Sequence, residues 1–282
     1  MKTKFISKKI INICYNVDKN ITSCSEEDAK YWAKSNSIRH ATTIKEILDY
    51  AKLNKKLKLK VLNASGIACG HQDFSILYFL KNFTKLNVEW DVLDSPNNPF
   101  LKNRLFKKFS SDLKINLKLI DFNKKIVINK KYDIILFTEI AEHLDYSVLL
   151  KTFKSLNEFM NPDSIIIITT PNMVSIINRL KILLGDNNSI YFGDGNLNLE
   201  KGLYGHIMVY DLKRLVKILE DNGFEIYKKY TFDYGWGPSE KKKIIRILSK
   251  FIKLISFMIS DSKNSLLIIA KKGEIKKIPL KI

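Results

Sequence analysis

Cysteine is scarce in this sequence, with three residues in 282, and no two of them have the spacing C-x-x-C. Cys14, Cys24 and Cys69 therefore form neither a disulfide framework nor a recognisable zinc motif. Small domains held together by disulfides are excluded, because they need a much denser set of cysteines. So few cysteines are typical of a reducing compartment, and we expect the protein to be cytoplasmic.

Long hydrophobic runs are missing as well. No stretch of about 18 apolar residues is present, which excludes an obvious membrane-spanning helix. The basic start, Met1 to Lys9, is followed by a short apolar stretch that Asn12 and Asn16 interrupt. Because there is neither a long hydrophobic segment nor a small-residue cleavage site, we do not expect a signal peptide.

Arginine is rare among the basic residues, although the net charge is +19. Such a charge would favour nucleic acid as a partner. However, only five of the 48 basic residues are arginines, and the lysines are spread along the chain. A built phosphate-binding face would favour arginine, whose guanidinium makes bidentate contacts. We therefore interpret the charge as a compositional bias and do not expect a nucleic-acid partner.

Strand-like and helix-like segments alternate along most of the chain, which is 45% hydrophobic and long enough for one large core or two modest ones. This alternation is typical of an α/β protein with one doubly wound, mostly parallel sheet of seven strands and helices on both faces. We expect an N-terminal helical cap over residues 1–56 and the sheet domain over residues 57–282. Strands are predicted at 57–62, 88–92, 115–121, 132–138, 164–170, 224–232 and 265–271, and helices at 22–53, 72–80, 101–109, 145–160 and 211–222.

Several helix boundaries have recognisable signals. Ser25 precedes three acids at 26–28, which is a plausible helix start. An alternative second start lies at Thr42 or Thr43, because Glu46 would complete a capping box with Thr43. Asp211 is expected to cap the helix that ends at Asn222-Gly223. Residues 173–205 are expected to be irregular. The apolar face of the first helix is expected to contain Trp32, Ile38, Ile44, Ile47 and Leu48.

A helical insertion is expected at about 238–260, because basic and polar residues recur at helical spacing within the apolar stretch from Ile244 to Ile259. The wide apolar face would pack on the domain or on a partner. Alternatively, the helix would make a peripheral contact with a membrane surface, with its lysines toward anionic lipid. The recurring residues are Arg246, Ser249, Lys250, Lys253 and Ser256.

Polar residues gather where two apolar runs end, in the segment from Tyr132 to Asn172. The first run stops at Thr138 and Glu139, and the second stops at Thr169-Thr170. Two buried parallel strands joined by a helix would have this pattern. In open α/β sheets, ligands bind at the carboxyl ends of the strands, so we expect a functional site here.

Three segments together carry a resemblance to a known family: Y-D-I-I-L-F-T-E-I-A-E-H-L, I-I-I-I-T-T-P-N, and G-H-I-M-V-Y-D-L-K-R-L-V-K-I-L-E-D-N-G-F-E-I. In this order and at these separations they resemble the Rossmann-like S-adenosylmethionine-dependent methyltransferases of types 11 and 23. The resemblance covers roughly residues 57 to 272. It implies an enzyme that transfers a methyl group from S-adenosylmethionine, its cofactor, to an acceptor.

The resemblance also implies that the cofactor binds at a glycine-rich loop after the first strand. That loop is N-A-S-G-I-A-C-G here, from Asn63 to Gly70. Ser65 stands where a glycine is common, and Asn63 stands where an acid is common. Asn63 can still accept a hydrogen bond, but it carries no charge. The residues of this loop that we expect to bind the cofactor are Asn63, Ser65, Gly66 and Gly70.

Acids after the next strands are implied as further cofactor contacts. Asp94, or else Asp91, would bind the ribose hydroxyls, because a carboxylate can accept both hydrogen bonds. Asp121 would contact the adenine amino group. Thr138 and Glu139 complete the expected cofactor-binding set.

The expected catalytic residues are His143, His206 and Glu142. A histidine at 143 could act as general base on a hydroxyl, since its pKa is ordinarily near neutral, and His206 is the second candidate. The pattern E-x-x-E-H with a distant histidine also resembles the metal site of quinone O-methyltransferases and small-RNA 3′-terminal methyltransferases, which suits Mg²⁺ or a transition metal. Because E-H-L is common in the family without a metal, we expect none here.

The predicted acceptor is a hydroxyl, or another nucleophile, on a small-molecule or carrier-linked substrate such as a sugar or surface glycan. Residues 1–50 and 173–205 are expected to cover it. Three alternatives remain: an RNA methyltransferase, an enzyme that uses a nicotinamide dinucleotide, and a non-catalytic binding domain with the same fold. The dinucleotide is disfavoured, because the first loop lacks the spacing G-x-G-x-x-G.

Overall fold

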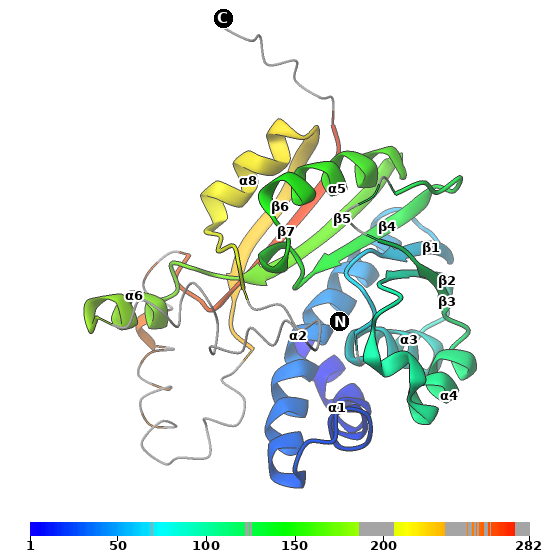
Figure 1. Cartoon of the computed structure of the whole chain (residues 1–282), viewed down its shortest axis with the longest axis horizontal. Coiled ribbons are helices and arrows are strands. Elements are labelled where there is room, and N and C mark those ends of the chain that lie inside the picture. The colour runs from blue at the N-terminus through cyan, green and yellow to red at the C-terminus, as the bar shows by residue number, and fades with distance from the viewer. Residues whose placement is uncertain are drawn as a thin grey trace, which may run out of the picture. The chain divides into compact units, whose positions relative to one another are not determined.

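The computed structural model describes residues 1–68, 70–121, 124, 126–185, 206–234 and 261–273, together with residues 247, 250, 252, 254–256 and 259. Its sheet contains seven strands: β1 (Lys58–Asn63), β2 (Asn87–Asp94), β3 (Asn116–Leu119), β4 (Tyr132–Thr138), β5 (Met160–Pro171), β6 (Phe224–Phe232) and β7 (Ser265–Lys272). Their order is β3-β2-β1-β4-β5-β7-β6 (Figure 1). Within the two units, β1 pairs with β2, β2 with β3 and β4 with β5 in parallel, and β7 pairs with β5 and β6 antiparallel. The predicted doubly wound, mostly parallel sheet is therefore confirmed.

The helices of the described residues connect or precede these strands. They are α1 (Thr3–Asn20), α2 (Glu26–Leu53), α3 (His71–Phe83), α4 (Arg104–Asp112), α5 (Tyr146–Glu158), α6 (Ile176–Leu183) and α8 (Leu212–Asp221), with short 3₁₀ helices η1 (Pro99–Lys102) and η2 (Ala141–His143). The chain divides into two compact units. The first comprises Met1–Ile120 with Asp233–Ile255, and the second comprises Asp121–Phe232 with Ser256–Ile282.

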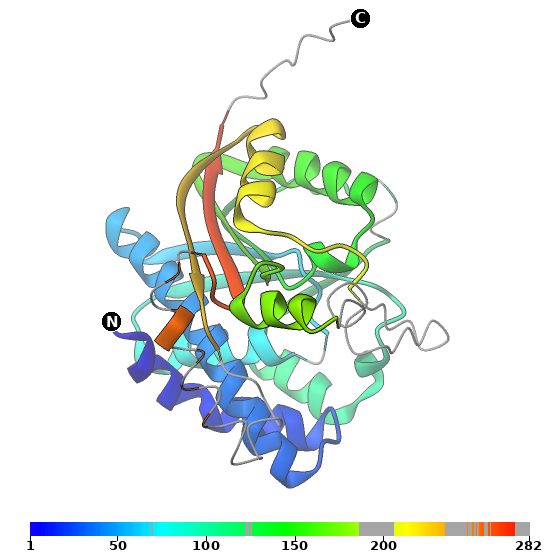
Figure 2. The same cartoon turned by 90° about the vertical axis from the view of Figure 1, so that its left-hand side faces the viewer.

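In the first unit, α1 and α2 lie side by side, and both contact α3 (Figures 1 and 2). The helix α1 lies within the expected N-terminal helical cap, but no helix was predicted before residue 22. It buries one apolar face at i, i+4 and i, i+3 spacings, through Ile6, Ile10, Cys14 and Val17, each with 0% exposure. The interrupted apolar stretch of the sequence is thus one face of an amphipathic helix.

The helix α2 begins at the predicted cap, where the Ser25 hydroxyl accepts a hydrogen bond from the Asp28 amide at 3.1 Å. The alternative second start at Thr42 or Thr43 is wrong, because the helix runs through both without a break. The Thr42 hydroxyl instead donates to the carbonyl of Ile38, one turn earlier. Trp32, expected on the apolar face, is 40% exposed.

Two further boundaries differ from the prediction. The helix expected over residues 101–109 is interrupted at Asn103, whose side chain accepts hydrogen bonds from the amides of Leu105 and Phe106 and thereby starts α4. Residues 173–205 were expected to be irregular, but 176–183 form α6, capped by Ser175. Residues 186–205 of that segment lie outside the described residues.

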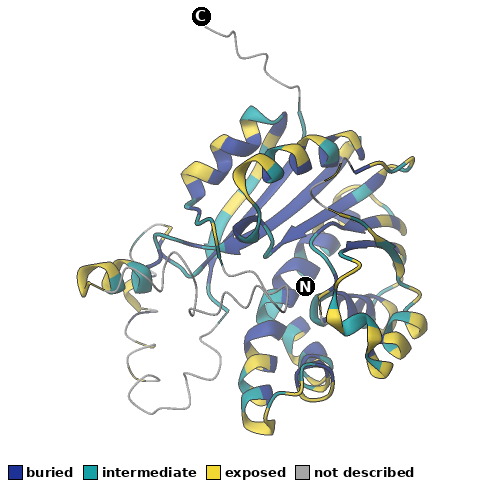
Figure 3. Ribbon diagram, viewed as in Figure 1, coloured by how far each residue is buried: buried dark blue, intermediate teal, exposed yellow. Residues whose placement is uncertain are grey.

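In the second unit, β4 is buried except at Asp133, and β5 is buried from Ser164 to Thr170 (Figure 3). Their apolar runs fill the core, which explains why strict alternation is absent from their sequences. The helix α8 is capped by Asp211 as predicted, through a 2.8 Å hydrogen bond from the Arg214 amide. It ends before Gly223, whose positive φ of 80° suits glycine.

The amphipathic segment from Ile244 to Ile259 falls largely outside the described residues, including Arg246, Ser249 and Lys253. Within the part of the chain that the structure describes, no helix is long and apolar enough to cross a membrane.

Candidate functional site

The loop after β1 is organised by the side chain of Asn63, which is fully buried at the carboxyl end of the strand. Its carbonyl oxygen Oδ1 accepts a hydrogen bond from the Ser65 amide at 2.9 Å. Its Nδ2 donates to the Gly66 carbonyl at 3.2 Å and to both carboxyl oxygens of Asp73, at 2.9 and 3.0 Å. Both ends of one amide side chain therefore hold the turn from 63 to 66 in place.

Asp73 lies in the first turn of α3 and is 1% exposed. Its Oδ1 also accepts a hydrogen bond from Trp90 Nε1, on β2, at 2.6 Å. Burial raises the pKa of Asp73 to about 7, although the hydrogen bonds from Asn63 and Trp90 oppose this rise. Neither Asp73 nor Trp90 was among the expected site residues, since nothing in their local sequence connects them with the loop.

Two glycines of the loop have backbone conformations that other residues adopt rarely. Gly66 has φ +80°, and a Cβ there would lie 3.2 Å from Asp94 Oδ1. Gly70 has φ +87°, and a Cβ there would overlap the Phe74 ring. The bare backbone at Gly66 thus runs directly beside the carboxylate at the end of β2. A ligand with both hydroxyl and charged groups could use this close approach of backbone and carboxylate, which fits the cofactor expected at the loop.

Asp94 is placed better than Asp91 to bind such a ligand. The Asp91 carboxylate lies 3.1 Å from Lys118 Nζ and accepts a hydrogen bond from Asn116 at 3.0 Å, so it holds β2 to β3. Asp94 lies beside Gly66 and accepts hydrogen bonds from the Ser95 amide and from Asn98 Nδ2, at 2.7 and 2.6 Å. Burial raises the pKa of Asp94.

Asn98 is a residue that sequence reasoning missed, although it belongs to the turn-rich run D-S-P-N-N-P. Its Nδ2 also donates to the Ala68 carbonyl at 2.9 Å, which links the loop to Asp94. Asp121 belongs to the second unit, and its side chain is 44% exposed, with Lys124 Nζ 4.0 Å away.

In the second unit, two threonines of β5 hold two glutamates that follow β4. The Thr169 hydroxyl donates to Glu139 Oε1 at 2.8 Å, and the Thr170 hydroxyl donates to Glu142 Oε2 at 2.8 Å. Glu139 has a left-handed backbone with φ 53°, and Thr138 before it is buried. The polar residues at the ends of these two strands are thus brought together, as their sequence positions predicted.

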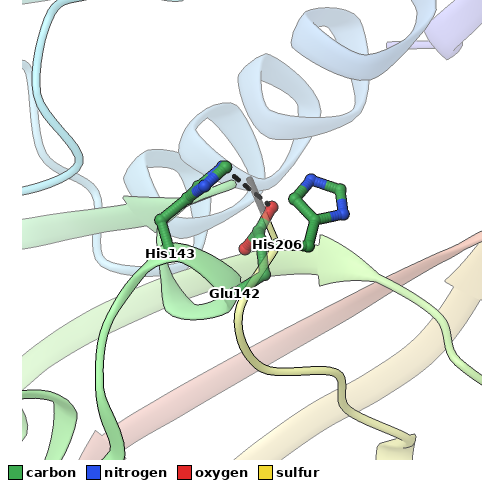
Figure 4. A group of neighbouring side chains, drawn as sticks. All are labelled: Glu142, His143 and His206. Carbon is green, nitrogen blue, oxygen red and sulfur yellow. Dashed lines mark ion pairs between the residues drawn. The ribbon is translucent and has the colours of Figure 1, made fainter. Parts of the chain in front are cut away.

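Glu142, His143 and His206 form a cluster in the second unit, with their side chains pointing toward one another (Figure 4). One nitrogen or oxygen atom from each residue lies within 4.8 Å of the others. His143 Nε2 is 4.0 Å from Glu142 Oε1, and the two imidazole centroids are 5.0 Å apart. Glu142 is buried, whereas the His143 side chain is 34% exposed. The cluster therefore presents imidazole to solvent over a buried carboxylate.

The backbone explains how His206, which lies 63 positions after His143 in the chain, joins this cluster. The Glu142 carbonyl accepts hydrogen bonds from the amides of Ile207 and Met208, at 2.9 and 3.1 Å. These bonds fix the segment that carries His206 against η2. The sequence pattern suggested the three residues, but this backbone connection could not be predicted from it.

The cluster is suited to two kinds of chemistry. An imidazole can remove a proton, and a neighbouring carboxylate can stabilise the imidazolium that results. Two imidazoles and one carboxylate are also a donor set that binds transition metals such as zinc or iron.

Comparisons with known proteins agree with this fold. A family model described as a methyltransferase domain matches residues 41–229. The fold is similar to an S-adenosylmethionine-dependent methyltransferase from Clostridium acetobutylicum, with a TM-score of 0.54 and 15% identity, covering 93% of this chain and 98% of that one. It is also similar to a protein assigned as a sarcosine dimethylglycine methyltransferase from Galdieria sulphuraria, with a TM-score of 0.52 and 14% identity, covering 84% of this chain and 88% of that one. At these identities the similarity shows the fold alone. No curated protein sequence matches the chain.

Proposed function

Since this chain belongs to the family of methyltransferase domains, with S-adenosylmethionine as its cofactor, we propose that it methylates a hydroxyl on a small-molecule or carrier-linked acceptor. A sugar or a surface glycan is the acceptor class that we favour. The observation that carries the proposal is the cluster of Glu142, His143 and His206. A neutral hydroxyl is a weak nucleophile and needs a base, and this cluster supplies one.

His143 is the proposed base. Its side chain is partly exposed, so an acceptor hydroxyl can reach it, while the buried carboxylate of Glu142 lies 4.0 Å from its Nε2. When the imidazole takes the hydroxyl proton, Glu142 stabilises the positive charge. His206, with its ring beside that of His143, is proposed to orient the acceptor oxygen or to serve as a second base.

S-adenosylmethionine, when bound, supplies a methyl group on a sulfonium centre that an oxygen nucleophile can attack in line. The chain's own task is to bind and align the two reactants. For the cofactor we propose the loop residues and the acids that follow the strands. In the first unit these are Asn63, Ser65, Gly66, Gly70 and Asp94. For Asp121, Thr138 and Glu139, which belong to the second unit, cofactor contact stays a prediction.

The experiment is a measurement of S-adenosylhomocysteine production with a panel of sugars and other hydroxyl acceptors. We expect His143→Gln to lower kcat by about 100-fold or more, because general-base catalysis is worth that much. Thr170→Val, which removes the hydrogen bond to Glu142, should lower kcat by about 10-fold and leave the KM for S-adenosylmethionine nearly unchanged. Lys151→Ala, at an exposed position of α5, is the matched control and should have full activity.

Two results would contradict this proposal. Full activity of His143→Gln would remove the imidazole from the chemistry. Binding of S-adenosylhomocysteine without turnover of any acceptor would favour a non-catalytic domain that keeps the fold.

Metal binding by the same cluster is the competing mechanism, and it predicts a different result. Titration calorimetry of the purified protein with Zn²⁺, Mn²⁺ and Mg²⁺ distinguishes the two. We expect turnover to be independent of these ions and unaffected by chelators. Metal binding would be supported if one of these ions binds, if His206→Gln abolishes that binding, and if turnover depends on the ion. In that case the ion, and not the imidazole, would hold and activate the acceptor oxygen.

A further inference from the structure

The hydrogen bonds that Asn63 donates are ones that the acid expected at this position could not make. A carboxylate has no hydrogen to donate, whereas the amide Nδ2 donates to the Gly66 carbonyl and to Asp73. The opposite end of the same side chain accepts from the Ser65 amide. The turn that brings Gly66 beside Asp94 therefore depends on a side chain that can both donate and accept.

Asp73 supplies a carboxylate next to this turn, ten residues later in the chain. It is held by donors from two strands, Asn63 on β1 and Trp90 on β2. The first turn of α3 also favours an acid there, because the helix dipole is positive at this end. The loop thus has an amide at position 63, where an acid was expected, and a carboxylate at position 73.

Two acids at these positions would oppose each other. The side chains of 63 and 73 are in hydrogen-bond contact at about 3 Å and are both buried. Two carboxylates that share a buried site cannot both ionise readily, so one would have to stay protonated. A second carboxylate at position 63 would therefore be unfavourable beside Asp73.

We propose that Asn63 and Asp73 are a matched pair of positioning residues, in which Asp73 supplies the hydrogen-bond acceptors that hold Asn63 and Asn63 transmits its position to the turn at Ser65 and Gly66. The asparagine is then a requirement of this loop and does not mark a degraded binding site. Cofactor affinity depends on having one amide and one carboxylate at positions 63 and 73.

The proposal is tested with three variants: Asn63→Asp, Asp73→Asn and the exchange that combines both. Titration calorimetry with S-adenosylhomocysteine gives the Kd, and thermal unfolding without ligand gives the stability of each variant. We expect each single change to weaken binding by about 10-fold or more, because a buried hydrogen-bonding group loses its partner or meets a like charge. The exchange should restore the Kd to within about 3-fold of the unmodified protein, which is the signature of a coupled pair.

The expected rescue has a geometric basis. An asparagine at 73 can donate to a carboxylate at 63 and still accept from Trp90 Nε1, and the carboxylate at 63 can still accept from the Ser65 amide. The hydrogen bond to the Gly66 carbonyl is lost, and the paired contact with both carboxyl oxygens of residue 73 is reduced to one hydrogen bond. Should Asn63→Asp fail to fold, Trp90→Phe removes a single donor to Asp73 and is expected to weaken binding by about 3-fold.

A control separates loop geometry from general stability. Leu59→Ala, at a buried position of β1, should lower the melting temperature and leave the Kd for S-adenosylhomocysteine unchanged. The proposal is overturned if Asn63→Asp binds as tightly as the unmodified protein, if the exchange binds no better than the weaker single variant, or if the unmodified protein does not bind this ligand. None of these measurements uses the acceptor, so a failure of the proposed hydroxyl chemistry would leave their outcome unaffected.

Discussion

Burial acts in opposite directions on two ionisable side chains of the first unit. It raises the pKa of Asp73 to about 7. It holds the pKa of His40 well below its usual value of 6.5, and the nearby Arg39 and His71 lower that pKa further. Both shifts favour the neutral form, because a low-dielectric interior disfavours charge. The consequences for stability are opposite. The stabilisation that protonated Asp73 gives the folded state is lost as pH rises from about 4 to 7. The stabilisation that neutral His40 gives is lost as pH falls below about 6.5.

The effect of His40 can be isolated by comparing the unmodified protein with His40→Gln. The folded protein keeps this imidazole neutral against Cys14 of α1, whereas the unfolded chain takes up a proton. We expect the stability advantage of the unmodified protein to decrease as pH falls below 6.5, by at most about 1.4 kcal/mol per pH unit. Urea unfolding at pH 5, 6, 7 and 8 measures it. Parallel pH profiles for the two proteins would contradict the prediction, and the exposed Lys52→Gln serves as control.

At the scale of residues, the sequence could predict which side chains gather at the strand ends, but not how they pair. Glu142 and His143 were identified from the end of one apolar run, and the structure places His206 beside them. Asp73 was not identified, because its role depends on which face of α3 turns toward β1. Sequence spacing gives the period of that helix, but the rotation of the helix against the sheet comes from packing.

At the scale of elements, β4, β5 and β7 were predictable because each contains a buried apolar run, and β3 was predictable because apolar and polar residues alternate in it. The helix α1 was missed because Asn12 and Asn16 interrupt its apolar stretch. These two asparagines are four residues apart and both exposed, so they lie on the solvent side of the helix. A helical period across residues 3–20 was the available signal. The predicted division into a cap at 1–56 and a domain at 57–282 stays a prediction.

The contact between α1 and α3 depends on a buried pair, with Asp18 Oδ1 2.7 Å from His71 Nε2. We expect Asp18→Ala to lower the free energy of unfolding by about 1.5–3 kcal/mol, since it removes a charge-assisted hydrogen bond between poorly exposed groups. The adjacent Lys19→Ala is a matched control. Its ammonium lies 3.8 Å from the exposed Glu26 carboxylate, so this change should leave the unfolding transition almost unchanged. Denaturant unfolding of the two variants measures the difference, and equal effects would refute the assignment.

At the scale of the whole molecule, the +19 charge is its most unusual property. Lysines of the described residues are found in both units, and many make local contacts. Lys45 pairs with Asp49 and Lys217 with Asp221 one helical turn away, while Lys271 lies over the Tyr227 ring. Charge distributed in this way raises the potential of the whole surface without building a site for one ligand.

The whole-molecule charge leads to a prediction about RNA, the alternative acceptor. We expect RNA binding that is independent of sequence, with a Kd of about 1–100 µM near physiological salt, and that weakens steeply as salt is raised, because it comes from counterion release. Fluorescence anisotropy over a series of salt concentrations measures it, with heparin as a competitor that should displace RNA equally well. RNA should not increase S-adenosylhomocysteine production. Sequence-dependent binding that persists at 0.2 M salt, or methylation of RNA, would show that some of these lysines form a specific site and would make RNA the acceptor.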